Sequence, residues 1–381
     1  MGKRILAFSV FLLLCFVPPT CFSLDFEKDI DCRSAILMEA STGKILFEKN
    51  ADEALPPASV TKIMTLLLVC EAVDNHIISL DDMVPTSEHA ASMGGSQVYL
   101  KVGEELSVRD MIKCVVIASA NDCAVALAEF LSGSESAFVD KMNARAVELG
   151  MEHTHFENTN GLDDTAVRHE ISARDIALMS RELISHSWIL DFSSTWIDSI
   201  RDGAFGLTNT NRLIRFYPGA NGLKTGSTSK AKFCISATAK RDDMQLIAVV
   251  MAAPTRDERN AIAKSLLDFG FSNYCIYHAA PAELTPAEVR RGKQPRCALT
   301  VAPFSAVLSR DLAAKVEYET VLQDVIEAPI CAGDAVGEVI FTADGSEIGR
   351  SPILAGENVE QIGFYDLFFR IFKASCFESA K

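Results

Sequence analysis

The order of strand-like and helix-like segments is the feature that most constrains the fold of this chain. Two short strand-like runs, residues 35–39 and 44–48, flank the turn residues Ser41-Thr42-Gly43 and predict a hairpin. Strand-like runs return at residues 233–239 and 246–252, after a long helical region. The expected helices cover residues 59–73, 107–130, 134–149, 172–185 and 256–269. Strands that bracket a helical insert favour an α+β or three-layer fold over a regular βαβ repeat.

The size and composition of the chain indicate a globular protein with more than one domain. Of its 381 residues, 49% are hydrophobic and 23% are charged, a balance that allows a buried core. The formal net charge of −15 argues against a nucleic-acid groove and against a broadly basic membrane-binding face. No stretch beyond the N-terminal region is apolar for the roughly 20 residues that a membrane-spanning helix requires.

The first 23 residues have the pattern of a secretory signal peptide. A basic start, Lys3 and Arg4, precedes an apolar run over residues 5–17, and prolines and small residues follow up to Ser23. An uncleaved N-terminal anchor is the alternative, but the run is short for crossing a bilayer. We therefore expect residues 1–23 to be removed and the mature protein to work outside the cytoplasm.

Neither the cysteines nor the histidines form a recognisable framework. The eleven cysteines include no C-x-x-C pair, and loss of Cys15 and Cys21 with the leader would leave nine, an odd number. His153 and His155 form an H-x-H pair without an obvious third ligand, so we expect a surface loop there and no metal or other cofactor. The cysteines in apolar segments are expected to be free buried thiols: Cys70, Cys114, Cys123 and Cys234.

The C-terminal part of the chain predicts a second, smaller unit. A Pro/Ala-rich shift at residues 279–286 precedes short strand-like runs, which predict a small all-β domain over residues 280–356. Asp344-Gly345 lies between two alternating runs and indicates a hairpin. The expected strands cover residues 298–302, 315–322 and 335–342, with a last one near Pro352.

Residues 357–381 are expected to form an amphipathic helix. An ordinary packing helix is one explanation for its apolar stripe. We favour an interfacial helix in the outer leaflet of a membrane, because little else in the chain would cover so broad an apolar face. The stripe has helical spacing: Phe364, Leu367, Phe368, Ile371 and Phe372.

The first of three motifs that could carry chemistry is Ser59-Val60-Thr61-Lys62. On a helix, residues i and i+3 share a face, so the Ser59 hydroxyl and the Lys62 amine can come within hydrogen-bond reach. A serine needs a neighbouring base to act as a nucleophile, and a lysine serves as that base only if burial or another cation lowers its pKa. The apolar run after Lys62 is consistent with burial, although a helix cap and a solvent-reaching lysine explain the same residues.

The other two motifs are Ser119-Ala120-Asn121 and Lys224-Thr225-Gly226-Ser227. The first interrupts a helical apolar stretch and could present its side chains to a cleft, where Ser119 would relay a proton and the Asn121 amide would hold a carbonyl and also bond to Lys62. A local helix cap is the alternative. The second precedes a strand-like run, and its glycine would allow a ligand backbone to approach closely. Lys224 and Thr225 would offer a cation and a hydroxyl to a carboxylate. An ordinary turn is the alternative, and the spacing fails the P-loop pattern.

In one chain, S-x-x-K, S-x-N and K-T-G in this order are the serine and lysine motifs of penicillin-binding proteins and class A β-lactamases. The sequence resembles the low-molecular-weight penicillin-binding proteins of the D-alanyl-D-alanine carboxypeptidase type. The stretches "PPASVTKIMT", "SANDCAVALAE" and "GLKTGSTSKAKFCISATAKRDDMQLIAVVM" carry the resemblance, which covers about residues 34–271. It implies a β-lactamase/transpeptidase-like catalytic domain over residues 24–275, with an antiparallel sheet flanked by helices.

The resemblance also implies a role for each motif residue. Ser59 would be the acylated nucleophile, Lys62 its base, and Ser119 the carrier of protons to and from the leaving D-alanine. The backbone N–H groups of Ser59 and Ser227 would form the oxyanion hole. Asn121 would orient the substrate amide. The residues implied for the substrate's terminal carboxylate and backbone are Lys224, Thr225, Gly226, Ser227 and, as a second cation, Arg259.

The same resemblance implies the partners of such an enzyme. The substrate would be a peptidoglycan stem peptide that ends in D-Ala-D-Ala, and β-lactam antibiotics would be covalent inhibitors at the same serine. The C-terminal helix would tether the protein to the outer face of the cytoplasmic membrane. No cofactor and no nucleic acid are implied.

Two other functions are open at this point. A class A β-lactamase would add a glutamate that activates water, and Glu157 lies in about the right interval. Two features argue against this class: "FENTNGL" matches the carboxypeptidase segment, and Ala120 stands where class A β-lactamases usually have aspartate. A catalytically silent peptidoglycan-binding protein would be expected to lose Ser59, Lys62 or Lys224, and none is lost. One departure from the carboxypeptidase pattern is Lys232, where a glycine is common.

Overall fold

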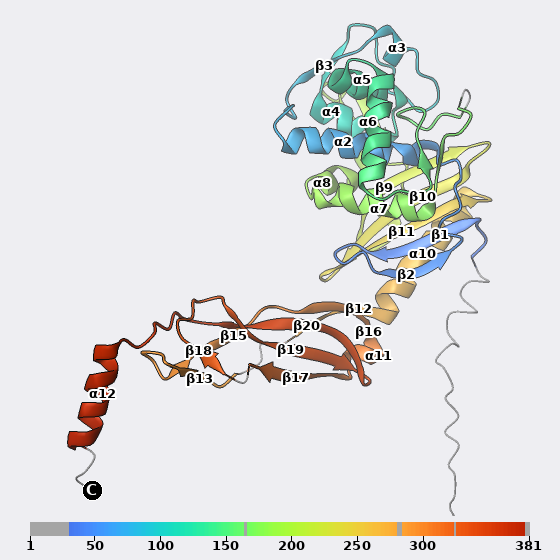
Figure 1. Ribbon diagram of the computed structural model, residues 1–381. Helices are drawn as coiled ribbons and strands as arrows, with labels where there is room; N and C mark the ends of the chain where they lie inside the picture. Colours follow the sequence, from blue (N-terminus) through green and yellow to red (C-terminus); the bar gives the residue numbers. More distant parts are fainter. Residues whose placement is uncertain (1–29, 164–165, 280–283, 324, 378–381) are drawn as a thin grey trace, which may run out of the picture.

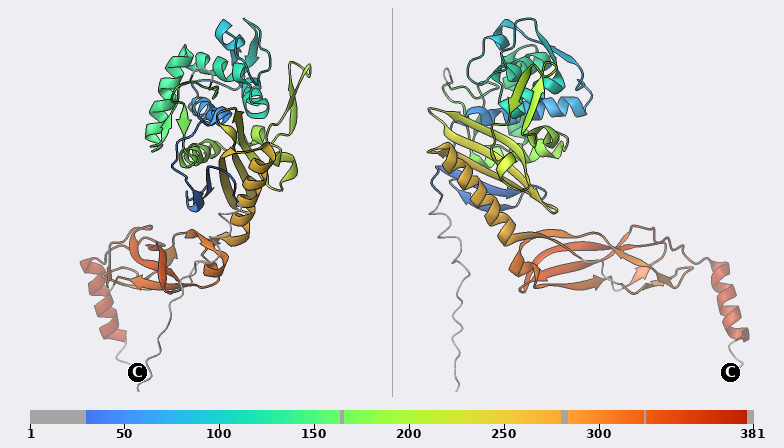
Figure 2. Two further views of the ribbon diagram at one scale, coloured as in Figure 1. Left: turned by 90° about the vertical axis from the view of Figure 1, so that its right-hand side faces the viewer. Right: turned by 180° about the vertical axis from the view of Figure 1, so that it is seen from behind.

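The computed structural model of the protein describes residues 30–163, 166–279, 284–323 and 325–377. The expected signal peptide, residues 1–23, lies outside the described residues. A body of helices around one sheet is followed by an elongated β-rich part, and a last helix lies at its far end (Figures 1 and 2). The expected α+β fold with a smaller all-β part behind it is confirmed.

The body is built on a five-stranded antiparallel sheet in the order β2-β1-β11-β10-β9. Its first two strands form the predicted N-terminal hairpin, and Ser34 at the start of the first strand lies opposite Met251. The helical insert therefore leaves the sheet continuous and packs against it. The strands are β1 (Ser34–Glu39), β2 (Ile45–Lys49), β9 (Ala220–Thr228), β10 (Lys232–Arg241) and β11 (Met244–Ala253).

Alternate side chains of the sheet enter two separate hydrophobic cores. Ile36 and Val249 belong to the core of the larger helical layer, whereas their neighbours Leu37 and Ala248 pack with helix α10 (Arg256–Asn273) on the other face. This period of two follows from strand geometry, in which successive side chains point to opposite faces. Helices therefore cover both faces of the sheet, and the body has three layers (Figure 1).

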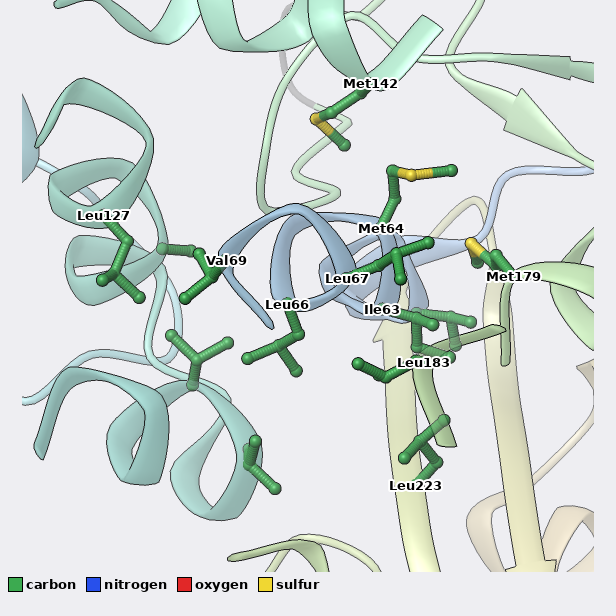
Figure 3. Close-up of a cluster of buried hydrophobic side chains, with 14 of the residues drawn as sticks. Ile63, Met64, Leu66, Leu67, Val69, Leu127, Met142, Met179, Leu183 and Leu223 are labelled. Atoms are coloured by element: carbon green, nitrogen blue, oxygen red, sulfur yellow. The ribbon is translucent and has the colours of Figure 1, made fainter. Parts of the chain in front are cut away.

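Helix α2 (Lys62–Asp74) lies at the centre of the larger helical layer. It is apolar nearly all round, and a helix of that kind has to be buried on every side. In Figure 3, Leu66 and Val69 of α2 lie on the side of Leu127, while Leu67 lies on the side of Met179. The other helices of this layer are α3 (Glu88–Ala91), α4 (Val108–Lys113), η2 (Cys114–Ala118), α5 (Asn121–Ser132), α6 (Glu135–Glu148), α7 (Ala173–Ser185) and α8 (Ile189–Ser193). Leu213 of the short helix α9 (Leu213–Phe216) belongs instead to the core shared with α10.

Helix starts follow the capping signals of the sequence. The Ser172 side chain accepts a hydrogen bond from the Asp175 N–H at the start of α7 and so caps this helix. Ser134 caps α6 in the same way. The segments between these helices also form three short antiparallel strand pairs: β3 (Met83–Pro85) with β4 (Glu105–Ser107), β5 (Thr154–His155) with β6 (Glu170–Ile171), and β7 (Ile197–Ile200) with β8 (Phe205–Thr208).

The second part of the chain consists of small β-sheets. The predicted hairpin joins its two longest strands, and Asp344 and Gly345 at the turn both have left-handed φ values, +52° and +78°, as a tight two-residue hairpin requires. The first strand begins at Tyr274, earlier than the expected boundary at residue 280. Its elements are β12 (Tyr274–His278), β13 (Ala287–Arg290), β14 (Arg296–Cys297), β15 (Leu299–Val301), β16 (Ser305–Ser309), α11 (Arg310–Ala313), β17 (Val316–Leu322), β18 (Ile326–Glu327), β19 (Ala335–Ala343) and β20 (Ser346–Ala355).

The β-rich part is attached to the body by packing as well as by the chain itself. Val307 of β16 is buried in the same core as the residues of α10. The Lys44 amine donates a hydrogen bond to the Val307 carbonyl at 2.7 Å, and the Arg310 guanidinium donates one to the Phe271 carbonyl at 3.0 Å. These contacts fix the β-rich part at the end of α10 that is remote from Arg256.

The last helix, α12 (Phe364–Phe377), begins later than residue 357, where the sequence predicted it. Val359 is buried in the core of the β-rich part and pairs with Ile330, so the chain is still tied to that part there. No helix in the described part of the chain is long and apolar enough to cross a membrane. The exposed apolar side chains of α12 are Phe364, Tyr365, Leu367, Phe368, Phe369, Ile371 and Phe372.

Shortening Leu67 should destabilise the body of the protein. Leu67 is fully buried, so Leu67→Ala leaves a cavity and should lower the free energy of unfolding by about 2–5 kcal/mol. The only two tryptophans of the sequence, Trp188 and Trp196, lie in the body, so denaturant titration followed by tryptophan fluorescence reports on this part. Val147→Ala, at a position that is 80% exposed, is the control and should change the free energy by no more than about 0.5 kcal/mol. Equal losses in the two variants would contradict the packing described for α2.

Candidate active site

Ser59 lies in a 3-10 turn, η1 (Ala58–Thr61), directly before Lys62 begins α2. The sequence predicted one continuous helix from Ser59. The chain instead enters the turn through Ala58, whose φ of +50° is a left-handed conformation that residues with a Cβ rarely adopt. The turn still places Lys62 Nζ 2.9 Å from Ser59 Oγ, the contact that the i, i+3 spacing predicted.

The Lys62 amine is completely buried and has three oxygen neighbours. Besides Ser59 Oγ, Nζ lies 2.5 Å from Asn121 Oδ1 and 2.8 Å from the main-chain oxygen of Asn160. Both of these carbonyl oxygens can only accept, so they take two N–H groups of the amine. In the neutral amine, the remaining lone pair then faces the Ser59 hydroxyl, which can donate its proton to it.

Burial is the main reason that the pKa of Lys62 lies well below the 10.5 usual for lysine, because removal from water disfavours the charged form. Repulsion from Lys224 lowers the pKa further, and the carboxylate of Asp122 opposes this effect. The surroundings of Lys62 thus favour the neutral amine, which is the form that can act as a base.

A break between helices presents Ser119 and Asn121. The preceding turn, η2, is a π-helix, an irregularity frequent at functional sites, and it ends at Ser119 with a left-handed φ of +63°. The Asn121 amide bonds on both sides, because Oδ1 accepts from Lys62 and Nδ2 donates to the Gly94 carbonyl at 2.7 Å. The predicted contact between Asn121 and Lys62 is therefore present, and it fixes which way the amide points.

Lys224 lies inside strand β9 rather than in a turn before a strand, and only 1% of its surface is exposed. Its amine donates hydrogen bonds to Ser119 Oγ at 2.8 Å and to the Thr225 carbonyl at 3.0 Å. Burial, and then repulsion from Arg259, lowers the pKa of Lys224 to about 7. Lys224 thus holds the Ser119 hydroxyl and acts on Lys62 through its charge, and it does not line the cleft that was expected to receive a carboxylate from it.

Gly226 allows strand β9 to lie directly against the turn of Ser59. A Cβ atom at this position would be 2.7 Å from the Pro57 carbonyl oxygen and 2.9 Å from the Ser59 backbone nitrogen, closer than real Cβ atoms come. We predicted that this glycine admits the backbone of a ligand. In the structure it admits the backbone of the Ser59 turn, η1, and so brings Ser59 beside Thr225.

Ser59 opens into a cleft with a volume of about 560 Å³. The predicted residues Ser119, Thr225 and Arg259 line it, as do Gly226 and Ser227, whereas Lys62, Asn121 and Lys224 lie behind its wall. A hollow of about 660 Å³ at the other end of α2 contains none of the motif residues. Lining residues that sequence reasoning did not single out are Ser96, Trp196, Thr208, Asn209, Thr210, Arg212, Phe216 and Arg256.

A buried hydrogen-bond chain supports the Ser59 turn, η1. The Thr61 hydroxyl donates to the Ala58 carbonyl at 2.9 Å and lies 2.7 Å from His169 Nε2. His169 Nδ1 accepts from the Glu157 N–H at 3.0 Å, so Nε2 carries the proton and donates to Thr61. Burial lowers the pKa of His169 to about 4, which keeps the ring neutral. Thr61 and His169 are 108 residues apart, so no local sequence pattern could have paired them.

Glu157, which the β-lactamase alternative requires at the site, is directed elsewhere. Its carboxylate accepts from the backbone N–H groups of Val167 at 2.7 Å and Arg168 at 3.0 Å. Neither Glu157 nor any other glutamate is among the described residues that line the cleft. Lys232, where the carboxypeptidases commonly have glycine, has a φ of +57°, a conformation that glycine adopts without steric cost.

The cysteines and histidines outside the site form no centre of their own. Across the described ranges, no group of three or more His, Cys, Asp or Glu side chains could hold a metal ion. The four cysteines predicted to be free buried thiols are buried and unpaired: Cys70, Cys114, Cys123 and Cys234.

The serine beside a buried lysine, the S-x-N turn and the K-T-G strand define a serine–lysine active site of the penicillin-binding class. Comparison with family models agrees: the model for D-alanyl-D-alanine carboxypeptidase, peptidase S11, matches residues 23–255. The model for the C-terminal domain of penicillin-binding protein 5 matches residues 278–361. The chain belongs to the D-alanyl-D-alanine carboxypeptidase family.

Relatives resemble the chain over most of its length. The D-alanyl-D-alanine carboxypeptidase DacF of Bacillus subtilis is 44% identical over 364 residues, which cover 93% of each chain. The crystal structure of penicillin-binding protein 5 from Haemophilus influenzae is 29% identical, with a TM-score of 0.74, and the match covers 87% of this chain and 98% of that one. Penicillin-binding protein D2 from Listeria monocytogenes, solved in an ampicillin-bound form, is 33% identical with a TM-score of 0.59; that match covers 64% of this chain and 98% of that one.

The pKa of Lys62 should respond to the charge of Lys224. In the Lys224→Met variant the pKa of Lys62 should rise, because a nearby cation no longer disfavours its protonated form. It should stay below 10.5, because burial, the larger cause, is unchanged. Nuclear magnetic resonance of protein labelled with carbon-13 at the lysine Cε atoms measures this titration. Lys240→Met, which removes an exposed lysine near the end of β10, is the control. If the Lys62 pKa is the same in Lys224→Met as in the unmodified protein, the electrostatic coupling is wrong.

Proposed function

We propose that the protein is a serine-type D-Ala-D-Ala carboxypeptidase that removes the terminal D-alanine from peptidoglycan pentapeptides. The observation that carries this function is the 2.9 Å contact between Ser59 Oγ and the buried Lys62 amine at the wall of the cleft. Membership in the carboxypeptidase family supports the substrate class. β-Lactams are proposed as covalent inhibitors at the same serine, because a related Listeria penicillin-binding protein has been solved in an ampicillin-bound form.

The first chemical step is acylation of Ser59. The Ser59 hydroxyl transfers its proton to neutral Lys62, and its oxygen attacks the carbonyl carbon of the penultimate D-alanine. The negative oxygen that develops is bound by the backbone N–H groups of Ser59 and Ser227. The close approach at Gly226 supports this pairing, because it brings the Ser59 backbone nitrogen against strand β9.

The second step releases D-alanine and restores the serine. The C–N bond breaks, and Ser119, held at 2.8 Å by the Lys224 amine, delivers its proton to the leaving nitrogen. Ser119 takes in its place the proton that Lys62 received from Ser59, so Lys62 is neutral again and can act as a base a second time. Water then attacks the ester carbonyl, its hydroxyl becomes part of the shortened peptide's carboxyl group, and its proton returns to the Ser59 and Lys62 pair. Acylation and hydrolysis thus use the same base and no group from outside the chain.

The terminal carboxylate of the substrate is proposed to bind at Thr225, Ser227 and Arg259. These residues line the cleft beside Ser59, and Arg259 supplies a cation there although it is 97% buried, with 3% of its surface exposed. Lys224 contributes to this binding through its charge rather than by contact. Asn121 is assigned to holding Lys62 as well as orienting the substrate amide, since its Oδ1 lies 2.5 Å from the Lys62 amine.

The two alternative functions are less well supported. A β-lactamase of class A needs a glutamate that activates water, and Glu157 instead holds backbone N–H groups of a neighbouring loop. A binding protein without activity would have no use for a neutral, buried lysine in contact with a serine. Burial disfavours the ammonium form of Lys62, and a lysine in that setting makes sense as a base.

We place the enzyme outside the cytoplasm, at the outer face of the cell membrane, after removal of residues 1–23. The catalytic domain, expected at residues 24–275, is followed by the β-rich domain, which we start at Tyr274 because β12 pairs with β16. Helix α12 is proposed to lie in the membrane interface. Its exposed aromatic and aliphatic side chains at the far end of the β-rich domain support this role, because burial of such a face in lipid is favourable.

Ser59→Ala should abolish both activity and inhibitor labelling. Release of free D-alanine from a peptide that ends in D-Ala-D-Ala should fall by about 10⁴-fold or more, since the variant has no nucleophile. Mass spectrometry after incubation with penicillin should show the adduct in the unmodified protein and none in the variant. A conserved fold is checked by the Trp188 and Trp196 fluorescence. An adduct that persists in Ser59→Ala would rule out this serine as the nucleophile.

A chain that ends at Gly363 should lose membrane affinity and keep its activity. Cosedimentation with phosphatidylglycerol vesicles should drop by about tenfold or more, because several exposed apolar side chains leave with α12. Ending at Gly363 keeps Val359 in the core of the β-rich domain, which a cut at residue 357 would remove. Tyr318→Ser, which removes an exposed ring elsewhere in that domain, is the control and should cosediment normally. Equal cosedimentation of the shortened and full chains would contradict this role of α12.

A further inference from the structure

Three arginines gather at one end of the cleft. Arg212 precedes α9, Arg256 is the first residue of α10, and Arg259 lies one turn further along the same helix. All three line the cleft that contains Ser59 and Thr225. We call Arg212, Arg256 and Arg259 the arginine cluster.

The charge of the arginine cluster is not neutralised within the cleft. Among the described residues that line it there is no Asp or Glu. The guanidinium groups of Arg212 and Arg256 make no hydrogen bond or ion pair with any described residue, and that of Arg259 donates only to Asn260 and to the Cys234 carbonyl. Arg212 and Arg256 are exposed and Arg259 is buried, whereas the partly buried Arg201 pairs with Glu104.

The charges of Arg212 and Arg256 both act on Arg259. Burial, and next the charges of Arg256 and then Arg212, lower the pKa of Arg259 to about 10, and Asp257 offsets only part of this effect. A chain with a net charge of −15 has ample carboxylates that could have neutralised these cations. An unneutralised cluster of cations beside a reaction centre is a site for an anionic ligand.

An aromatic rim adjoins the arginine cluster. The rings of Trp196 and Phe216 meet edge to face, with their centres 6.3 Å apart, and Phe216 is 66% exposed although it lines the cleft. This rim offers apolar surface to a ligand whose charged groups bind to the arginines. A single D-alanine, with one methyl group and one carboxylate, is too small to use it.

One carboxylate does not account for the whole arginine cluster. The leaving D-alanine carries a single carboxylate, and Arg259 with Thr225 accounts for it in the function proposed above. We propose that this end of the cleft accepts leaving groups larger than D-alanine that carry a second carboxylate, and that Arg212 and Arg256 are the residues that select them. The inference rests on the proposed carboxypeptidase function and extends it to D-alanyl bonds whose amine belongs to an acidic residue or peptide. Peptide cross-links between cell-wall strands have this chemistry when the amine side bears free carboxylates.

The chemistry of the step is unchanged and only the amine differs. Ser59 Oγ forms an ester bond with the D-alanyl carbonyl carbon while the C–N bond to the acidic amine breaks. The leaving nitrogen takes its proton through Ser119, and water then hydrolyses the ester. No oxidant, reductant or second reactant besides water is required.

The test compares leaving groups that differ in one charge. Three acylated peptides of the form X-D-Ala-Z are used, with Z as D-Ala, D-Glu or D-Gln, and kcat/KM is measured for release of each free amino acid. In the unmodified protein, D-Glu should be released about fivefold more efficiently than D-Gln, the range for two exposed ion pairs. This ratio should fall towards one in the Arg212→Gln/Arg256→Gln variant, and towards one in the unmodified protein at high salt.

A matched control and a separate readout make the outcomes distinct. Arg215→Gln removes an arginine next to Phe216 that does not line the cleft, and it should keep the ratio of the unmodified protein. Penicillin labelling of each variant shows that the nucleophile site is folded. A ratio near one in the unmodified protein, or an unchanged ratio in the double variant, would overturn the inference. Absence of D-alanine release from the D-Ala peptide would instead overturn the carboxypeptidase function itself.

Discussion

The site depends on a buried lysine whose charged form the protein interior disfavours. Removal of an ammonium group from water is costly, so the pKa of Lys62 lies well below its usual value, and the Asp122 carboxylate offsets only part of this effect. Two carbonyl oxygens, from Asn121 and Asn160, satisfy its N–H groups, and in the neutral amine the lone pair is left to the Ser59 hydroxyl. The first six residues of helix α2, which begins at Lys62, are buried. Lys224, also buried, adds a repulsive charge and holds Ser119 in place.

The backbone around Lys62 is unfavourable in isolation and is held by the fold. Ala58 and Ser119 both have left-handed φ values, a conformation that costs energy for residues with a Cβ and persists only when the surroundings determine it. Gly226 and Gly161 allow other segments to pack closely against the Ser59 turn. A Cβ at Gly161 would lie 1.9 Å from the Ala58 carbonyl oxygen. Strand β9 at Gly226 and the loop at Gly161 therefore pack directly against the Ser59 turn and restrict its conformation.

The cationic cleft and the apolar helix α12 lie in different parts of the molecule, an arrangement that suits an enzyme of the cell wall. Carboxylates dominate the chain as a whole, but the cleft carries only cations among its described charged lining residues. The β-rich domain separates the cleft from α12, which lies at the far end of the molecule (Figure 2). An apolar helix at that end and a cationic cleft at the other are consistent with the proposed enzyme, which would bind a membrane surface and act on anionic peptides at a distance from it.

The sequence by itself determined the local features. Apolar periodicity placed α6 and α7 to within one residue and α2 to within three at its start, and the spacing of Ser59 and Lys62 predicted their contact, because i, i+3 neighbours on a helical turn share a face. Only the tertiary structure decided what depends on distant segments. It buried Lys224, which was expected to offer its cation to a carboxylate, set Gly226 against the Ser59 turn, joined His169 to Thr61, and placed Arg212 and Arg256 on one cleft. These pairs come from separate elements that come into contact only when the helical insert packs against the sheet. A local sequence pattern contains no information about such contacts.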